Sequence, residues 1–169
     1  IFKEAMEFGF QFDVLVIFGA SVMQILLPVF SLIGAYYFYR EYNSILAMEA
    51  IRERTYRKLV IKRIIVNALK IAITLYLAYF VYMTLMNYFA TGNLGASSRT
   101  LFGDILDPSF YVEHTYFYFL LEAFVTMFMM PLAYTVFAQA MVLVFEDFKK
   151  VILVPLTYYY GVTMIGYVM

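Results

Sequence analysis

The stretch IIVNALKIAITLYLAYFVYMTLMNYF, residues 64–89, decides the fold. Lys70 is its only charged residue. A helix needs about 20 mostly apolar residues to cross the hydrocarbon core of a bilayer, because each residue advances the helix by about 1.5 Å. A tilted barrel strand needs only about 9–11 residues and alternates in polarity, which this stretch does not. We therefore predict a membrane-spanning α-helix over residues 64–89.

The composition of the whole chain agrees with a membrane location. Of the 169 residues, 64% are hydrophobic and only 14% are charged, whereas soluble domains average about 25% charged residues. So few polar side chains could not cover the surface of a soluble core. The net charge is zero, so no basic field indicates a nucleic-acid partner. The chain has no cysteine, which excludes disulfides and thiolate metal sites.

Three further apolar runs are long enough to cross a membrane, and each contains a proline. The run with Pro131 is longer than a bilayer requires, so it must tilt, break near the proline or protrude. We predict an all-α polytopic membrane helix bundle that forms a single transmembrane domain over residues 1–169. Its four spans are expected at about 14–38, 64–89, 115–145 and 151–169.

The linkers between these spans differ in their content of Lys and Arg. Linkers 39–63 and 146–150 together hold nine such residues, and linker 90–114 holds only Arg99. Four spans place the first and third linkers on the same side, and the side richer in Lys and Arg is normally the cytoplasm. We expect a multi-pass protein of the plasma membrane, with 39–63 and 146–150 cytoplasmic and 90–114 external.

The basic linker also carries a helical pattern. Ile45, Met48 and Ile51 recur every three residues, and Ser44 is a suitable N-cap. We predict a short amphipathic helix over about 44–54, followed by a basic turn into the second span. Such a helix either rests on lipid headgroups or docks its apolar edge into a groove on a cytoplasmic partner. The residues alone leave both interpretations open.

Residues 28–70, PVFSLIGAYYFYREYNSILAMEAIRERTYRKLVIKRIIVNALK, resemble the first cytoplasmic segment of ABC-2-type transporter permeases. In that family a span ends in an aromatic-rich stretch and an acidic E-x-x-G, and a coupling helix, a basic stretch and the next span follow. Glu41 falls at the family's glutamate, and Arg52 and Lys62 fit its basic positions. Ser44 stands where glycine is usual.

Residues 107–160, DPSFYVEHTYFYFLLEAFVTMFMMPLAYTVFAQAMVLVFEDFKKVILVPLTYYY, are similar to the same family's external loop, long span, tight internal turn and proline-containing next span. Members have about six spans, so the resemblance implies one span before and one after this chain. It implies a permease subunit that exports peptide, lipid or other amphipathic cargo. The implied partners are a nucleotide-binding ATPase subunit, a second permease subunit (identical or different) and membrane lipid. The residues expected to couple to the ATPase are Glu41, Ile45, Met48, Ile51 and Arg52.

Several chemical classes lack their usual signature in this sequence. There is no G-x-x-x-x-G-K-[ST] phosphate-binding loop in the sequence. We therefore expect the partner subunit to bind and hydrolyse ATP. This chain itself is expected to have no enzymatic activity and to bind no cofactor. His114 is the only histidine and is interpreted as an interfacial residue rather than a metal ligand. A membrane scaffold without transport activity remains the alternative function. An intramembrane enzyme that uses Glu122 ranks last, because no span provides it with a suitable titratable partner.

Polar residues inside the spans are the remaining candidates. Glu122 is the only acidic residue well inside a span, where a charge costs about 2.5–3.5 kcal/mol on insertion scales. It either lines a transport path or forms a hydrogen bond between helices, and both interpretations remain open. Lys70 is expected to snorkel to the cytoplasmic surface. Gln24, Asn67 and Gln139 are expected to form hydrogen bonds between helices.

Overall fold

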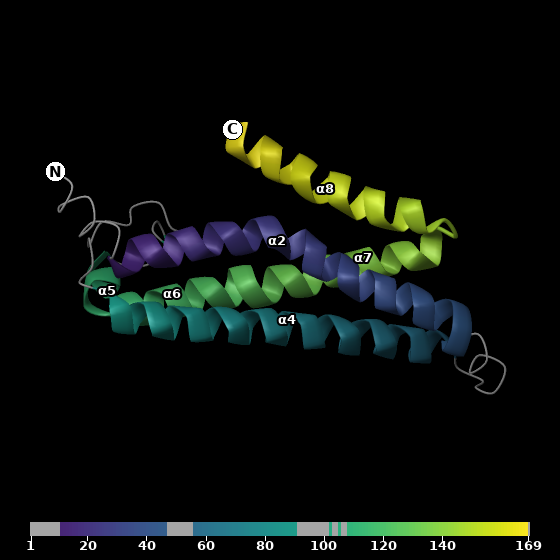
Figure 1. The fold of residues 1–169 in the computed structure, drawn as a ribbon, viewed down its shortest axis with the longest axis horizontal. Helices are drawn as coiled ribbons and strands as arrows, with labels where there is room; N and C mark the ends of the chain where they lie inside the picture. Colours follow the sequence, from purple (N-terminus) through teal and green to yellow (C-terminus); the bar gives the residue numbers. More distant parts are fainter. Residues whose placement is uncertain (1–10, 47–55, 91–101, 103–104, 106–107, 169) are drawn as a thin grey trace. The chain divides into compact units, whose positions relative to one another are not determined.

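The computed structural model describes residues 11–46, 56–90, 102, 105 and 108–168, and these ranges contain helices and no strand (Figure 1). The predicted all-α class is therefore confirmed for this part of the chain. The elements are α2 (Phe12–Glu41), the π-helical η1 (Tyr42–Leu46), α4 (Tyr56–Phe89), α5 (Pro108–Glu113), α6 (Thr115–Ala123), the π-helical η2 (Phe124–Met129), α7 (Met130–Val144) and α8 (Phe148–Val168).

Within the described residues, three helical stretches are long and apolar enough, by length and composition, to cross a membrane: Phe12–Ser44, Tyr56–Phe89 and Thr115–Val144. They correspond to the predicted spans 14–38, 64–89 and 115–145. Only 22%, 22% and 39% of their most apolar windows are buried, so most residues of these windows are at least partly exposed. The predicted fourth span, 151–169, is helical as α8 but is not one of these three stretches, so a count of four spans remains a prediction.

The second long helix begins earlier than the sequence pattern indicates. It starts at Tyr56 rather than Ile64, and residues 56–63, which we expected to form a basic turn, are helical. That part of the prediction is wrong. Lys and Arg are good helix formers, and those between Arg57 and Arg63 are exposed, so their charges do not oppose the helix. Hydropathy marks where a helix becomes apolar, not where it begins.

The third long helix accommodates Pro131 through a local change of helix type. Proline has no backbone N–H, and its ring crowds the carbonyl of the residue four positions earlier, here Met127. Met127 lies in η2, a stretch of π-helix that directly precedes α7. Because π-helical turns are wider, the chain passes the proline without leaving the helix. A local widening, not a break, accommodates Pro131.

The chain divides into two compact units. Unit 1 comprises Ile1–Ile25 and Thr74–Met129, and unit 2 comprises Leu26–Ile73 and Met130–Met169. Helices α2 and α4 each contribute one part to unit 1 and one part to unit 2.

Unit 1 has a core of mainly aromatic and large side chains. Two tyrosines of α4 bond to the backbone of α2: the Tyr79 hydroxyl donates to the Val16 carbonyl at 3.0 Å, and the Tyr82 hydroxyl donates to the Leu15 carbonyl at 2.6 Å. The Tyr82 ring lies where a side chain on Gly19 would be, so the glycine permits this close approach. The buried core residues are Phe12, Val16, Tyr79, Met83, Tyr111, Tyr118, Phe119, Ala123 and Met127.

Unit 2 combines a smaller apolar core with small and polar residues. Ile71 of α4 occupies the space beside Gly34 of α2, and Thr135 and Gln139 of α7 lie close to the same glycine. A small residue such as Gly34 lets neighbouring helices approach closely in membranes. The Tyr134 hydroxyl donates to the Pro155 carbonyl and thereby joins α7 to α8. The buried core residues are Phe38, Val60, Ile64, Val142 and Val151.

Candidate functional site

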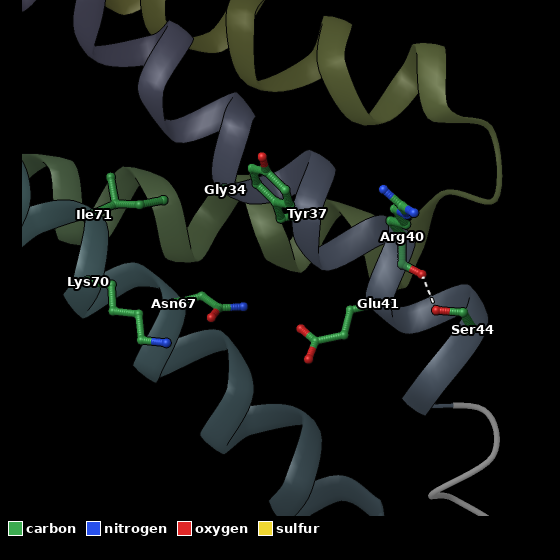
Figure 2. A pocket seen from close by; sticks show the side chains of 8 residues that line it. All are labelled: Gly34, Tyr37, Arg40, Glu41, Ser44, Asn67, Lys70 and Ile71. Atoms are coloured by element: carbon green, nitrogen blue, oxygen red, sulfur yellow. Dashed lines mark hydrogen bonds between the residues drawn. The ribbon is translucent and has the colours of Figure 1, made fainter.

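A polar pocket lies between α2 and α4 within unit 2 (Figure 2). Its volume is about 600 Å³. Figure 2 shows the side chains of Glu41, Asn67 and Lys70 directed into the space between the two helices. The lining residues are Gly34, Tyr37, Arg40, Glu41, Ser44, Asn67, Lys70 and Ile71.

An ion pair stands beside this pocket and joins the two helices. Arg63 Nη1 of α4 lies 3.3 Å from Glu41 Oε1 of α2. The Glu41 side chain is 24% exposed and that of Arg63 is 45% exposed, so water weakens the attraction and the pair contributes little stability. The pair is informative because of its position. It places the end of α2 beside the beginning of α4, on the two sides of the segment that connects them.

The end of α2 lies against the start of α8 in unit 2, so described residues of the two Lys- and Arg-rich linkers come together there. The Tyr39 hydroxyl, at the end of α2, donates to the Glu146 carbonyl at 3.3 Å, and the Tyr39 ring lies 5.0 Å from the Phe148 ring. Tyr36 also contacts Phe148, with ring centroids 5.6 Å apart. This arrangement is the one that the predicted alternation of spans requires for linkers 39–63 and 146–150.

The short connection before α8 is closed by a side-chain cap that the sequence pattern did not reveal to us. The Asp147 carboxylate accepts a hydrogen bond from the Lys149 backbone N–H at 3.0 Å. The Asp147 carbonyl accepts from the backbone N–H groups of Lys150 and Val151. Aspartate is among the preferred N-cap residues, so the pattern Asp-Phe-Lys-Lys-Val was the available signal. The tight turn predicted over 146–150 is therefore the capped start of α8.

Ser44 does not cap a new helix. Its hydroxyl donates to the Arg40 carbonyl at 2.8 Å, and it lies inside η1, which continues α2 without interruption. Our prediction of an N-cap at Ser44 is wrong, because a serine hydroxyl can bond backward to the carbonyl four residues earlier. The first three residues of the predicted coupling helix 44–54 are thus the π-helical end of the first long helix.

The predicted coupling residues are only partly described. Glu41 lies at the pocket and pairs with Arg63, and Ile45 belongs to η1. Met48, Ile51 and Arg52 lie outside the described residues. The structure therefore brings Glu41 together with Asn67 and Lys70, a grouping that sequence analysis did not propose, and a docking edge at 45–51 stays a prediction.

Glu122 lies in unit 1 and not at the pocket. It is half-buried in α6, its Oε2 atom is buried, and it lies within electrostatic range of Tyr79 on α4. Its backbone carbonyl accepts a hydrogen bond from the Thr126 hydroxyl at 2.8 Å. Both cavities described for the chain, the polar pocket and the one beside His114, lack Glu122 among their lining residues.

Three polar residues lie together at the buried centre of unit 2. The Thr135 hydroxyl donates to the Ser31 hydroxyl at 3.0 Å, and both residues are fully buried. Gln139 is also fully buried, but its amide nitrogen and oxygen have no hydrogen-bond partner in the described part of the chain. The hydrogen bond between helices expected for Gln139 is therefore not found there. Its amide nitrogen lies near Gly34, which lines the pocket on α2.

His114 lies between α5 and α6, exposed to solvent or headgroups. Its ring packs on Phe110 and Phe117, with centroids 5.4 and 6.5 Å away. It lines a small pocket of about 300 Å³ in unit 1 together with Phe12 and Asn87. Among the described residues, no group of three or more His, Cys, Asp or Glu side chains could hold a metal ion.

No protein family, curated protein or solved structure matches this chain.

Proposed function

We propose that this chain is the membrane-spanning permease subunit of an ABC transporter of the ABC-2 type. It would export peptide, lipid or other amphipathic cargo, and a separate subunit would hydrolyse ATP. The observation that carries the proposal is the ion pair between Glu41 and Arg63 at 3.3 Å. It marks the place where the ends of two long apolar helices lie side by side, on either side of segment 47–55, so a partner that binds this segment would stand next to both helix ends.

Two further features support this proposal. The pair lies at the end of unit 2 where the Tyr39–Glu146 hydrogen bond draws in the second Lys- and Arg-rich linker, so one partner surface could reach both linkers. The chain also has no phosphate-binding loop, so the energy for transport would come from another chain.

The direct test is a charge placed on the predicted docking edge. Met48→Glu is expected to abolish transport and ATPase association while the protein still inserts and remains folded. Ala50→Glu adds the same charge roughly 200° around a helix from Met48 and should leave both properties intact. Transport and ATPase association that are normal in Met48→Glu would contradict the docking interpretation and favour the scaffold function.

The membrane orientation has its own test. The chain has no cysteine, so single cysteines at Ser44 and Ser98 can be labelled without background. On intact cells, an impermeant thiol reagent should label Ser98→Cys and should not label Ser44→Cys until the membrane is permeabilised. The opposite pattern would reverse the orientation and place the proposed ATPase contact on the wrong side.

A further inference from the structure

We infer that the pocket between α2 and α4 binds the phosphate-bearing headgroup of a membrane phospholipid. The inference goes beyond the proposed transport function, because a lipid site of this kind does not depend on an ATPase partner. It rests on the depth of the pocket in the bilayer, on its charge and on the division of its lining into a polar and an apolar end.

The depth follows from the length of α4. Its 34 residues extend about 51 Å, whereas the hydrocarbon core is about 30 Å thick. If the apolar end at Phe89 marks one face of the core, about 14 residues at the other end lie beyond it. Those are residues 56–69, so Asn67 and Lys70 stand at the boundary between acyl chains and headgroups.

The charge of the pocket favours an anion. Of the side chains directed into the pocket, Lys70 is positive and Glu41 is negative, and Arg63, 3.3 Å from Glu41, adds a second positive charge beside the pocket. The Asn67 amide adds neutral hydrogen-bond donors. Basic pockets between helices at the membrane surface are suited to lipid headgroups. If the predicted orientation holds, this end also faces the leaflet that carries the anionic lipids.

The lining changes from polar to apolar along the helices. Because Glu41 pairs with Arg63 and Gly34 approaches Ile71, α2 and α4 run antiparallel here, with Glu41 and Ser44 nearer the linker. Gly34 and Ile71 line the opposite end, where the first methylene groups of a lipid would lie. Tyr37, 62% exposed at the rim, is of a residue type enriched at membrane interfaces.

The inference can be tested with purified protein in nanodiscs of phosphatidylcholine that contain a small fraction of phosphatidylglycerol. Native mass spectrometry should show phosphatidylglycerol retained on the wild type. Lys70→Gln should weaken retention about fivefold, from the typical contribution of one cation near a membrane surface. Lys58→Gln, an exposed cation on the same helix outside the pocket, is the matched control and should retain the lipid as the wild type does.

The source of the phosphate is resolved by competition and by a second variant. Inorganic phosphate at millimolar concentration should not displace the lipid, because it has no acyl chain to contact Ile71; displacement would show a soluble-phosphate site instead. Asn67→Leu keeps the side-chain size, removes the donors and should also weaken retention. The inference would be overturned if Lys70→Gln and Asn67→Leu retained phosphatidylglycerol as well as the wild type does. It would also be overturned if the control Lys58→Gln lost as much lipid as Lys70→Gln.

Discussion

Unit 1 and unit 2 use the same two helices, α2 and α4, but pack them with different chemistry. In unit 1, aromatic rings fill the space and the hydroxyls of Tyr79 and Tyr82 bond to backbone carbonyls of α2. In unit 2, Gly34 and alanines stand at the helix contacts, and charged residues line an open pocket. In unit 1 the space between α2 and α4 is closed mainly by aromatic rings, whereas in unit 2 polar and charged side chains of the same two helices line a pocket.

The largest test of this contrast is the removal of a buried ring. Phe119→Ala in unit 1 should lower the free energy of unfolding by about 3 kcal/mol, because Phe119 is 3% exposed and its ring packs on Phe12 and Tyr111. Val151→Ala removes a smaller fully buried side chain from the unit 2 core and should cost less. Unfolding in mixed micelles with increasing denaturing detergent would measure both. If both variants lost the same free energy of unfolding, the proposed energetic difference between the two units would be contradicted.

A smaller effect is expected from filling the glycine positions. Gly19→Ala would force the Tyr82 ring away and disturb its bond to the Leu15 carbonyl, so the variant should lose about 1–3 kcal/mol. Gly161→Ala is the matched control on α8, because nothing lies within 4 Å of the added methyl group. That variant should gain up to about 1 kcal/mol from helix propensity. A stabilised Gly19→Ala would show that Tyr82 does not depend on this close approach.

Glu122 gives a more modest effect. Its half-buried position near Tyr79 favours a structural contribution over a transport path. Glu122→Leu should then cost about 0.6 kcal/mol, typical of polar contacts between helices in membranes, and Glu122→Gln should be tolerated. A Glu122→Gln variant that folds normally but transports cationic cargo differently would restore the path interpretation.

The smallest effect on stability is expected at the ion pair. Glu41→Gln should change the free energy of unfolding by no more than about 0.5 kcal/mol, because both side chains are partly exposed. Under the proposed function the same variant should nevertheless reduce coupling of ATP hydrolysis to transport. A double-mutant cycle compares the free energies of unfolding of Glu41→Gln, Arg63→Gln and the double variant. It separates the interaction between the two side chains from the contribution of each residue alone. A loss of several kcal/mol would mean that the ion pair is structural.

The sequence predicted the parts of the fold that depend on hydropathy alone. The apolar runs at 14–38, 64–89 and 115–145 correspond to long helices because an apolar run of that length has few other ways to satisfy its backbone in lipid. Boundaries were less predictable. The helix begins at Tyr56 although its first turns are basic, and Ser44 bonds backward instead of capping. Both outcomes depend on local hydrogen bonding that polarity does not report.

The candidate site was less accessible to sequence reasoning than the spans. Glu41 and Lys70 were each singled out, one by resemblance and one as a charge within a span, but nothing in their spacing brings them together. Their meeting depends on how α2 and α4 align, which involves tertiary contacts such as the fit of Ile71 beside Gly34. Gln139 shows the same limit, since its burial without a described partner follows from tertiary packing.

The pairing of α2 with α4 next to segment 47–55 also bears on loop closure. The entropy cost of closing this segment between the two helix ends rises only with the logarithm of its length. Doubling the length of a flexible segment adds only about 0.6 kcal/mol to the cost of closing it. Insertions in 47–55 should therefore leave the helices paired, so this segment can vary in length and sequence almost independently of the membrane fold.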